Sequence, residues 1–170
     1  MTDRNYPLLD GHPANLSLRI AALVSAFTSL AVFAWAIKAH DRVFTDLDGA
    51  SLCVMILATK SSYAVLWSLV PLTVRLLLRR ALHPGVHIAF DFIAFSAVFA
   101  TTLVTMIVLT PIAEGGYSCR RSACRDTTLP KVEFFGFAMA LLTSVLHFVL
   151  FVWACWACDR LRKQPRKTEF

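Results

Sequence analysis

Three long runs of this sequence contain no charged residue, and each is close to the length of a membrane-spanning helix. They cover residues 20–37, 92–113 and 134–157. A helix needs roughly 20 predominantly apolar residues to cross the hydrocarbon core of a bilayer. A fourth apolar region, residues 50–74, contains one charge, Lys60. The four regions together predict four transmembrane helices.

The composition agrees with a chain that lies mostly within a membrane. The 170 residues are 57% hydrophobic and only 16% charged, whereas a soluble domain carries about 25% charged residues. The net charge of +6 does not predict nucleic-acid binding, because the basic residues gather at the ends of the apolar runs. We therefore expect an all-α membrane protein, a four-transmembrane-helix bundle with short loops. Its expected parts are an N-terminal tail (1–15), a transmembrane domain (16–158) with spans at 16–38, 50–78, 86–112 and 132–157, and a basic tail (159–170).

The distribution of Lys and Arg predicts the orientation of the chain. The segments "RLLLRR" (75–80) and "DRLRKQPRK" (159–167) fall on the same side of a four-span protein, and clustered basic residues favour the cytoplasmic side. Both termini are then cytoplasmic, in a multi-pass protein of the plasma membrane or the secretory pathway. In the alternative reading, the first apolar run is a signal peptide with "AWA" (34–36) as its cleavage site, which leaves three helices.

Two opposite charges are predicted to lie at similar depth in spans one and three. Counted from the cytoplasmic end of each span, Arg19 and Asp91 both lie within the first few turns, which places Asp91 about 6–8 Å inside the membrane. Ionisable residues inside a span usually face the bundle interior and pair with one another. We therefore predict an Arg19–Asp91 ion pair. Alternatively, Arg19 extends to the membrane edge, and Asp91 pairs with Arg75, Arg79 or Arg80.

Two further polar residues lie within predicted spans. Lys60 lies nearer the outer face of span two, where it either reaches the interface or contacts an ion or substrate. His147 lies near the middle of span four, and we expect it to form an interhelical hydrogen bond. Haem ligation requires two histidines at matching depth, and His87 does not match His147 in depth. No cofactor is therefore predicted.

The cysteines form two pairs at opposite ends of the predicted bundle. Cys119 and Cys124 lie in the second outer loop, where an oxidising compartment favours a disulfide between them; the alternative is two free thiols. Cys155 and Cys158 have C-x-x-C spacing at the inner boundary of span four. Reversible acylation and simple apolar packing are both open for this second pair.

The arrangement of spans and charges resembles the MARVEL superfamily and the related Casparian-strip membrane proteins. These proteins have four spans, both termini inside, a basic residue in span one and an acidic residue in span three. In this sequence the basic position corresponds to Arg19 and the acidic position to Asp91, and the resemblance extends to no other individual residue. The segment "HPGVHIAFDFIAF" (83–95) is similar to the fungal branch of this group, and the resemblance covers about residues 14–158.

The resemblance implies a non-enzymatic protein that organises membrane subdomains, takes part in trafficking or acts as a scaffold. The sequence contains neither a Gly-rich phosphate loop nor an H-E-x-x-H motif. Expected partners are the bilayer, anionic inner-leaflet lipids at the basic tail, and other membrane proteins or further copies. One alternative is a small transporter that uses Lys60 or Asp91. Another is a four-helix thiol oxidoreductase, although a direct relay between cysteine pairs at opposite faces is physically implausible.

Overall fold

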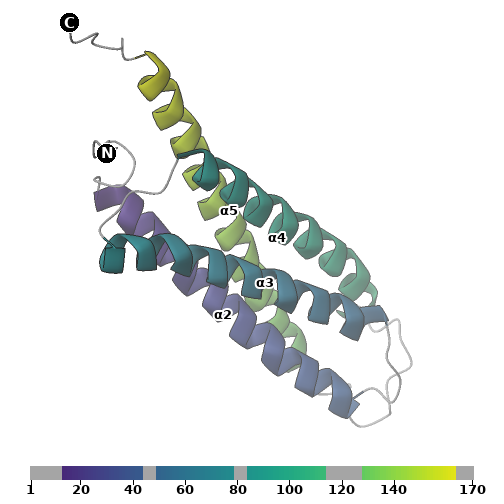
Figure 1. Ribbon diagram of the computed structural model, residues 1–170. Coiled ribbons are helices and arrows are strands. Elements are labelled where there is room, and N and C mark those ends of the chain that lie inside the picture. Colours follow the sequence, from purple (N-terminus) through teal and green to yellow (C-terminus); the bar gives the residue numbers. More distant parts are fainter. Residues whose placement is uncertain (1–12, 44–48, 79–83, 114–127, 164–170) are drawn as a thin grey trace, which may run out of the picture.

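The computed structural model of the protein describes residues 13–43, 49–78, 84–113 and 128–163, and all of these residues are helical. The all-helical fold class expected from the sequence is therefore confirmed. A short π-helix, η1 (Val74–Leu78), follows directly on the second helix. The four α-helices, shown in Figure 1, are α2 (Pro13–Val43), α3 (Gly49–Thr73), α4 (Pro84–Ala113) and α5 (Thr128–Lys163).

Each α-helix contains one segment that is long and apolar enough to cross a membrane. The chain therefore has the architecture of a multi-pass membrane protein, with one crossing for each apolar region identified in the sequence. The side of the membrane on which the two termini lie stays a prediction from the positions of Lys and Arg. The four candidate spans are Pro13–Ala39, Leu52–Thr73, Gly85–Val108 and Lys131–Arg160.

Proline residues mark several features of the helices. Pro13 and Pro84 are the first residues of α2 and α4, where the missing N–H of proline has no helical partner to lose. Pro71 lies inside α3 and lacks the N–H that would bond the carbonyl of Trp67. The chain changes to the wider π geometry at Val74, and such departures from α geometry often follow a local break in the hydrogen-bond ladder.

The four α-helices form a ring in which consecutive helices pack against each other and the last helix closes the ring against the first. Helix α2 contacts α3 and α5, and α4 also contacts α3 and α5. Neighbouring helices are antiparallel, so the start of α2 and the end of α5 lie at the same end of the bundle (Figure 1). This is the up-and-down connectivity that short loops allow.

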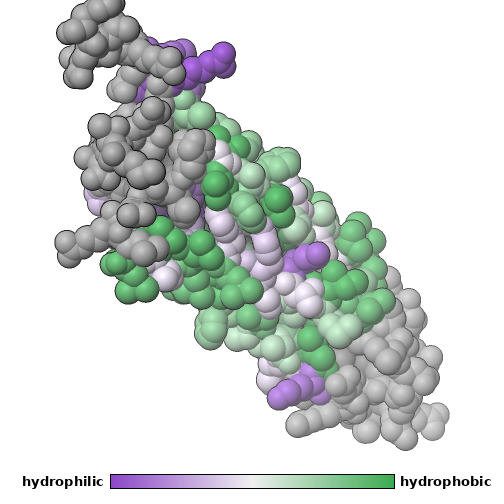
Figure 2. All heavy atoms as spheres, viewed as in Figure 1, coloured by the Kyte–Doolittle hydropathy of each residue, from purple (hydrophilic) through white to green (hydrophobic). Residues whose placement is uncertain are grey.

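The outer surface of the bundle is broadly apolar. Figure 2 shows hydrophobic residues over most of the visible middle of the molecule and a strongly hydrophilic group at the end where α5 finishes. Phe27, Leu66 and Ile107, from three different helices, are all more than half exposed. An apolar surface of this extent is unfavourable in water and is covered by lipid tails when the helices cross a bilayer.

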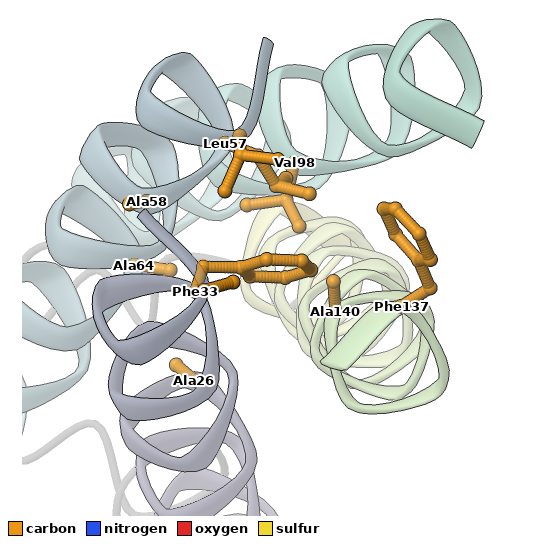
Figure 3. Packing of buried hydrophobic residues seen from close by; sticks show 10 residues of the cluster. Ala26, Phe33, Leu57, Ala58, Ala64, Val98, Phe137 and Ala140 are labelled. Carbon is orange, nitrogen blue, oxygen red and sulfur yellow. The ribbon is translucent and has the colours of Figure 1, made fainter. Parts of the chain in front are cut away.

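Part of the bundle interior is filled by a cluster of apolar side chains, and we call this group the apolar layer. The ring of Phe33 extends from α2 into the space between Val98 of α4 and Ala140 of α5 (Figure 3). It also meets the ring of Phe137 at a centroid distance of 5.3 Å. The apolar layer comprises Ala26, Phe33, Ala36, Val54, Leu57, Ala58, Ala64, Val98, Phe137 and Ala140.

A glycine in α5 allows that helix to approach α2 closely. A Cβ atom added at Gly136 would lie 2.7 Å from Cγ1 of Val32 and 3.0 Å from the Phe33 ring. Val32 has a stiff β-branched side chain, so it does not move away easily. Small residues at such contacts are typical of membrane helix pairs, whose association depends on close packing.

Side-chain hydroxyl groups join each pair of neighbouring helices. Such hydrogen bonds are a common source of interhelical attraction where hydrophobic burial supplies no driving force. They surround the interior at several depths and connect all four helices in a ring. The contacts are Thr143 Oγ1 to Ser25 Oγ (2.9 Å), Ser29 Oγ to Ser61 Oγ (3.3 Å), Thr105 Oγ1 to the Cys53 carbonyl (3.4 Å) and Ser144 Oγ to the Phe95 carbonyl (3.3 Å).

Candidate functional site

Asp91 lies at the centre of the most polar region of the bundle interior. Its side chain is 0% exposed. The helical spacing of α4 places Asp91 on the same face as Ala94, Val98, Thr102 and Thr105, and all four of these residues are buried. The carboxylate therefore points to the bundle interior and away from lipid.

Arg19 of α2 donates hydrogen bonds to this carboxylate from two nitrogen atoms. Its Nη2 donates to Asp91 Oδ2 at 2.9 Å, and its Nη1 donates to Oδ1 at 3.4 Å. The planar guanidinium group matches the two carboxylate oxygens, so the contact fixes orientation as well as charge. The ion pair predicted from depth along the two spans is present in the structure.

The two remaining helices each add a donor to the same oxygen of Asp91. Trp67 of α3 donates from Nε1 to Oδ1 at 2.7 Å, and its ring stacks on Phe90 with centroids 4.5 Å apart. His147 of α5 places Nδ1 3.1 Å from Oδ1. An ionised carboxylate only accepts hydrogen bonds, so Nδ1 of His147 carries the proton in this contact.

His87 completes the group from one turn before Asp91 on α4. Its Nδ1 lies 2.9 Å from Nη2 of Arg19. Arginine has donors but no acceptor, so Nδ1 of His87 accepts and the imidazole is in its neutral form with the proton on Nε2. The His87 ring also meets the ring of Trp67 edge-on at 6.2 Å between centroids. The guanidinium of Arg19 is thus held between an anion and a neutral acceptor.

We call Arg19, Trp67, His87, Asp91 and His147 the polar layer. Every α-helix contributes at least one member, and Asp91 contacts a donor from each of the other three helices. All five side chains are at least nine-tenths buried. The charges of Arg19 and Asp91 cancel, which is the usual condition for ionisable groups within a membrane.

Three polar atoms in this region have no hydrogen-bond partner among the described residues. They are His147 Nε2, Arg19 Nε and Ser68 Oγ. An unsatisfied polar atom in a buried position carries a desolvation cost. Both oxygens of the Asp91 carboxylate therefore accept hydrogen bonds, whereas these three atoms around it do not form one with the described residues.

The sequence located part of this site and missed the rest. His147 forms the interhelical hydrogen bond that its mid-span position suggested, and its partner is Asp91. Trp67 and His87 were not predicted as members. A signal was available for Trp67, because a tryptophan N–H buried within a span needs an acceptor. The acceptor becomes evident only when α3 and α4 are known to be neighbours.

The other predicted residues lie away from the polar layer. Lys60 is exposed on the outer surface of α3. Cys155 is partly buried and Cys158 is exposed near the end of α5, both as free thiols. The Cys119–Cys124 pair lies outside the described residues, as do Arg79 and Arg80. Arg75 lies in η1, and its side chain is likewise outside the description.

The described helices contain no arrangement of side chains suited to a metal ion. Within them, no group of three or more His, Cys, Asp or Glu side chains is placed to hold a metal ion. The two histidines of the polar layer contact Asp91 and Arg19 through their Nδ1 atoms. In the polar layer, the positive charge of Arg19 in α2 neutralises the negative charge of Asp91 in α4.

Comparison of the chain with protein-family models, with curated proteins and with solved structures gives no match.

Proposed function

We propose that this protein is a non-enzymatic, MARVEL-like tetraspan protein that organises its surrounding membrane through lateral contacts. It would reside in the plasma membrane or in membranes of the secretory pathway, and its neighbours would be other membrane proteins or further copies of itself. The observation that carries the proposal is that Asp91 is engaged by donors from all three other helices. The carboxylate thereby connects α4 to the other three α-helices inside the bundle.

The engagement of Asp91 favours a structural role over transport. A carboxylate that couples transport to ion movement has to be reached by its ion from a water-filled path. Both oxygens of Asp91 are already within hydrogen-bond distance of protein donors, and the side chain has no exposed surface. Release of these contacts would also leave the Arg19 guanidinium buried without its anion, which is costly.

The position of Lys60 supports the same choice. Its side chain is exposed on the outside of the ring of helices. Long basic side chains at such positions extend along the helix toward the interface, and helical side chains lean toward the N-terminal end of their helix. The N-terminal end of α3 is also the nearer end for Lys60.

The outer surface is suited to lateral contacts within the membrane. Aromatic rings from α4 and α5 form a continuous series on that surface, with Phe92 against Phe151 at 5.4 Å and Phe95 against Phe148 at 5.0 Å between centroids. Phe92 and Phe148 are also substantially exposed. Large exposed aromatic side chains are common anchors of interfaces.

Proximity labelling of the full-length protein in its native membrane, together with imaging of its distribution, tests the proposal. We expect lateral clustering and a reproducible set of labelled membrane neighbours. The matched control is an unrelated four-span protein expressed at the same level with the same tag. A diffuse distribution with the same neighbours as the control would overturn the organiser role.

A further inference from the structure

A groove runs along the outer face of α5. It has a volume of about 460 Å³ and is lined only by apolar and aromatic side chains. This volume lies within the range that binds small molecules in proteins. Val152 and Trp156 in its wall are each almost half exposed, so lipid can reach it directly. The lining residues are Phe148, Val149, Val152, Trp153 and Trp156.

A cation stands at one end of this groove. The guanidinium of Arg160 lies over the ring of Trp156 at 4.2 Å from its centroid. Val152, Trp156 and Arg160 follow one another at four-residue spacing, so they share one face of the helix. The stacking turns the Arg160 side chain back along α5 toward the groove, in the direction that helical side chains prefer.

The depth of these groups in the membrane matches the two parts of a phospholipid. Arg160 is the last residue of the apolar span Lys131–Arg160, so its charge lies at the boundary with the headgroups. Phe148, at the other end of the groove, lies about 18 Å deeper at the rise of a helix. The groove therefore runs from a cation at the boundary into the hydrocarbon region.

The charge of Arg160 is not matched by a carboxylate in the described residues. Lys163, one turn further on, donates to Asp159 at 2.7 Å. Arg160 is instead placed on the aromatic ring of Trp156. Guanidinium groups bind phosphate through paired hydrogen bonds from N–H groups in the plane of the group, and stacking on the Trp156 ring leaves this N–H edge available.

We propose that this groove binds an anionic phospholipid, with one acyl chain along the groove and the phosphate or headgroup anion at Arg160. This site gives a location on α5 for the expected contact with anionic lipids, and it does not rest on the organiser role. A second copy packed in parallel across the same face would bring two Arg160 side chains to equal depth, which like-charge repulsion opposes. A sterol fits the apolar wall but offers no anion to the guanidinium.

Quenching of tryptophan fluorescence by lipids with brominated chains tests the site in full-length protein. In a Trp35→Phe background, the remaining lipid-exposed ring in the described helices is Trp156, with Trp153 partly covered and Trp67 buried. Dibrominated phosphatidylserine and dibrominated phosphatidylcholine are compared at equal mole fraction in phosphatidylcholine bilayers. We expect about fivefold preferential quenching by the anionic lipid, which corresponds to the roughly 1 kcal/mol of one basic residue near an anionic surface.

Three variants separate a specific site from general attraction. Arg160→Gln should abolish the preference, whereas Arg162→Gln removes the same charge from another face of α5 and should leave it intact. Val152→Phe narrows the groove with the charge unchanged and should lower quenching by the anionic lipid. These side chains are exposed, so helical content measured by circular dichroism should be unchanged. Equal quenching by both lipids, equal effects of the two arginine variants, or no effect of Val152→Phe would each overturn the proposal.

Discussion

The polar layer and the apolar layer contact their surroundings in different ways. In the polar layer, Asp91 contacts donors at 2.7–3.1 Å from three helices, and each of these contacts has a required direction. In the apolar layer, Phe33, Leu57 and Val98 are fully buried and contact their neighbours through shape alone. A shift of one helix along its axis would break the first set of contacts and only rearrange the second.

The difference matters more in a bilayer than it would in water. Lipid tails are as apolar as leucine, so moving an apolar side chain from lipid into the interior gives little free energy. Close packing and hydrogen bonds then determine which arrangement of the helices is preferred. The polar layer therefore specifies the register of the four helices, and the apolar layer adds stability once that register is set.

The largest effect is expected for the substitution Asp91→Asn in the polar layer. It leaves the Arg19 guanidinium buried without an anion, and breaking a buried pair in this way costs about 3–5 kcal/mol. Unfolding by SDS in lipid bicelles measures the free energy. The matched control is Asp159→Asn, which neutralises an exposed carboxylate and should change stability by less than about 0.5 kcal/mol.

A double-mutant cycle with Arg19→Gln sharpens this test. The pair of substitutions removes both charges, so the double variant should lose less stability than the sum of the two single variants. Strictly additive losses would show that the two side chains do not stabilise each other.

A smaller loss is expected for Phe33→Ala in the apolar layer. Large-to-small changes of a buried phenylalanine cost about 3–5 kcal/mol in water-soluble proteins. In a bilayer the exposed side chain contacts lipid and not water, so the free energy of transferring it to the interior is small. We therefore expect the free energy of unfolding to fall by roughly 1–3 kcal/mol, from lost packing and the remaining cavity. Phe27→Ala is the control, since Phe27 is on the same helix but 61% exposed. Equal losses at both positions would mean that packing around Phe33 contributes nothing specific.

A loss of about 1 kcal/mol is expected for Trp67→Phe, which removes one donor from Asp91 and keeps an aromatic ring beside Phe90. Interhelical hydrogen bonds in membranes contribute about this much. Trp35→Phe, at an exposed position, should be nearly neutral in the same unfolding assay. A neutral Trp67→Phe would remove α3 from the set of helices that Asp91 holds in register.

The smallest effect is expected for Lys60→Met. The side chain is exposed on the outer surface of α3 and belongs to neither layer, so stability should change by less than about 0.5 kcal/mol. A larger loss would indicate a function for Lys60 in contacts outside the single bundle. Loss of a measured solute flux with unchanged stability would instead favour the transporter alternative.

The features of this structure that depend on position along a helix could be predicted from the sequence. The lengths of the apolar runs predicted the helices, and depth along two spans paired Arg19 with Asp91. The features that depend on which helices are neighbours could not be predicted from the sequence. Trp67 could be assigned to Asp91 only from the ring order, in which α3 packs against α4. Gly136 likewise has no visible role until α5 is placed against Val32 of α2.

The central position of Asp91 has a consequence for biosynthesis. Its donors come from α2, α3 and α5, and α5 is the last of the described helices to leave the ribosome. Until α5 arrives, His147 is absent and the carboxylate has one donor fewer. Proteins made from the N-terminus fold progressively, so in a chain truncated before α5 the Asp91 carboxylate keeps its ion pair with Arg19 and lacks the hydrogen bond from His147. The hydrogen bonds to Asp91 are thus complete only once all four described α-helices are in place.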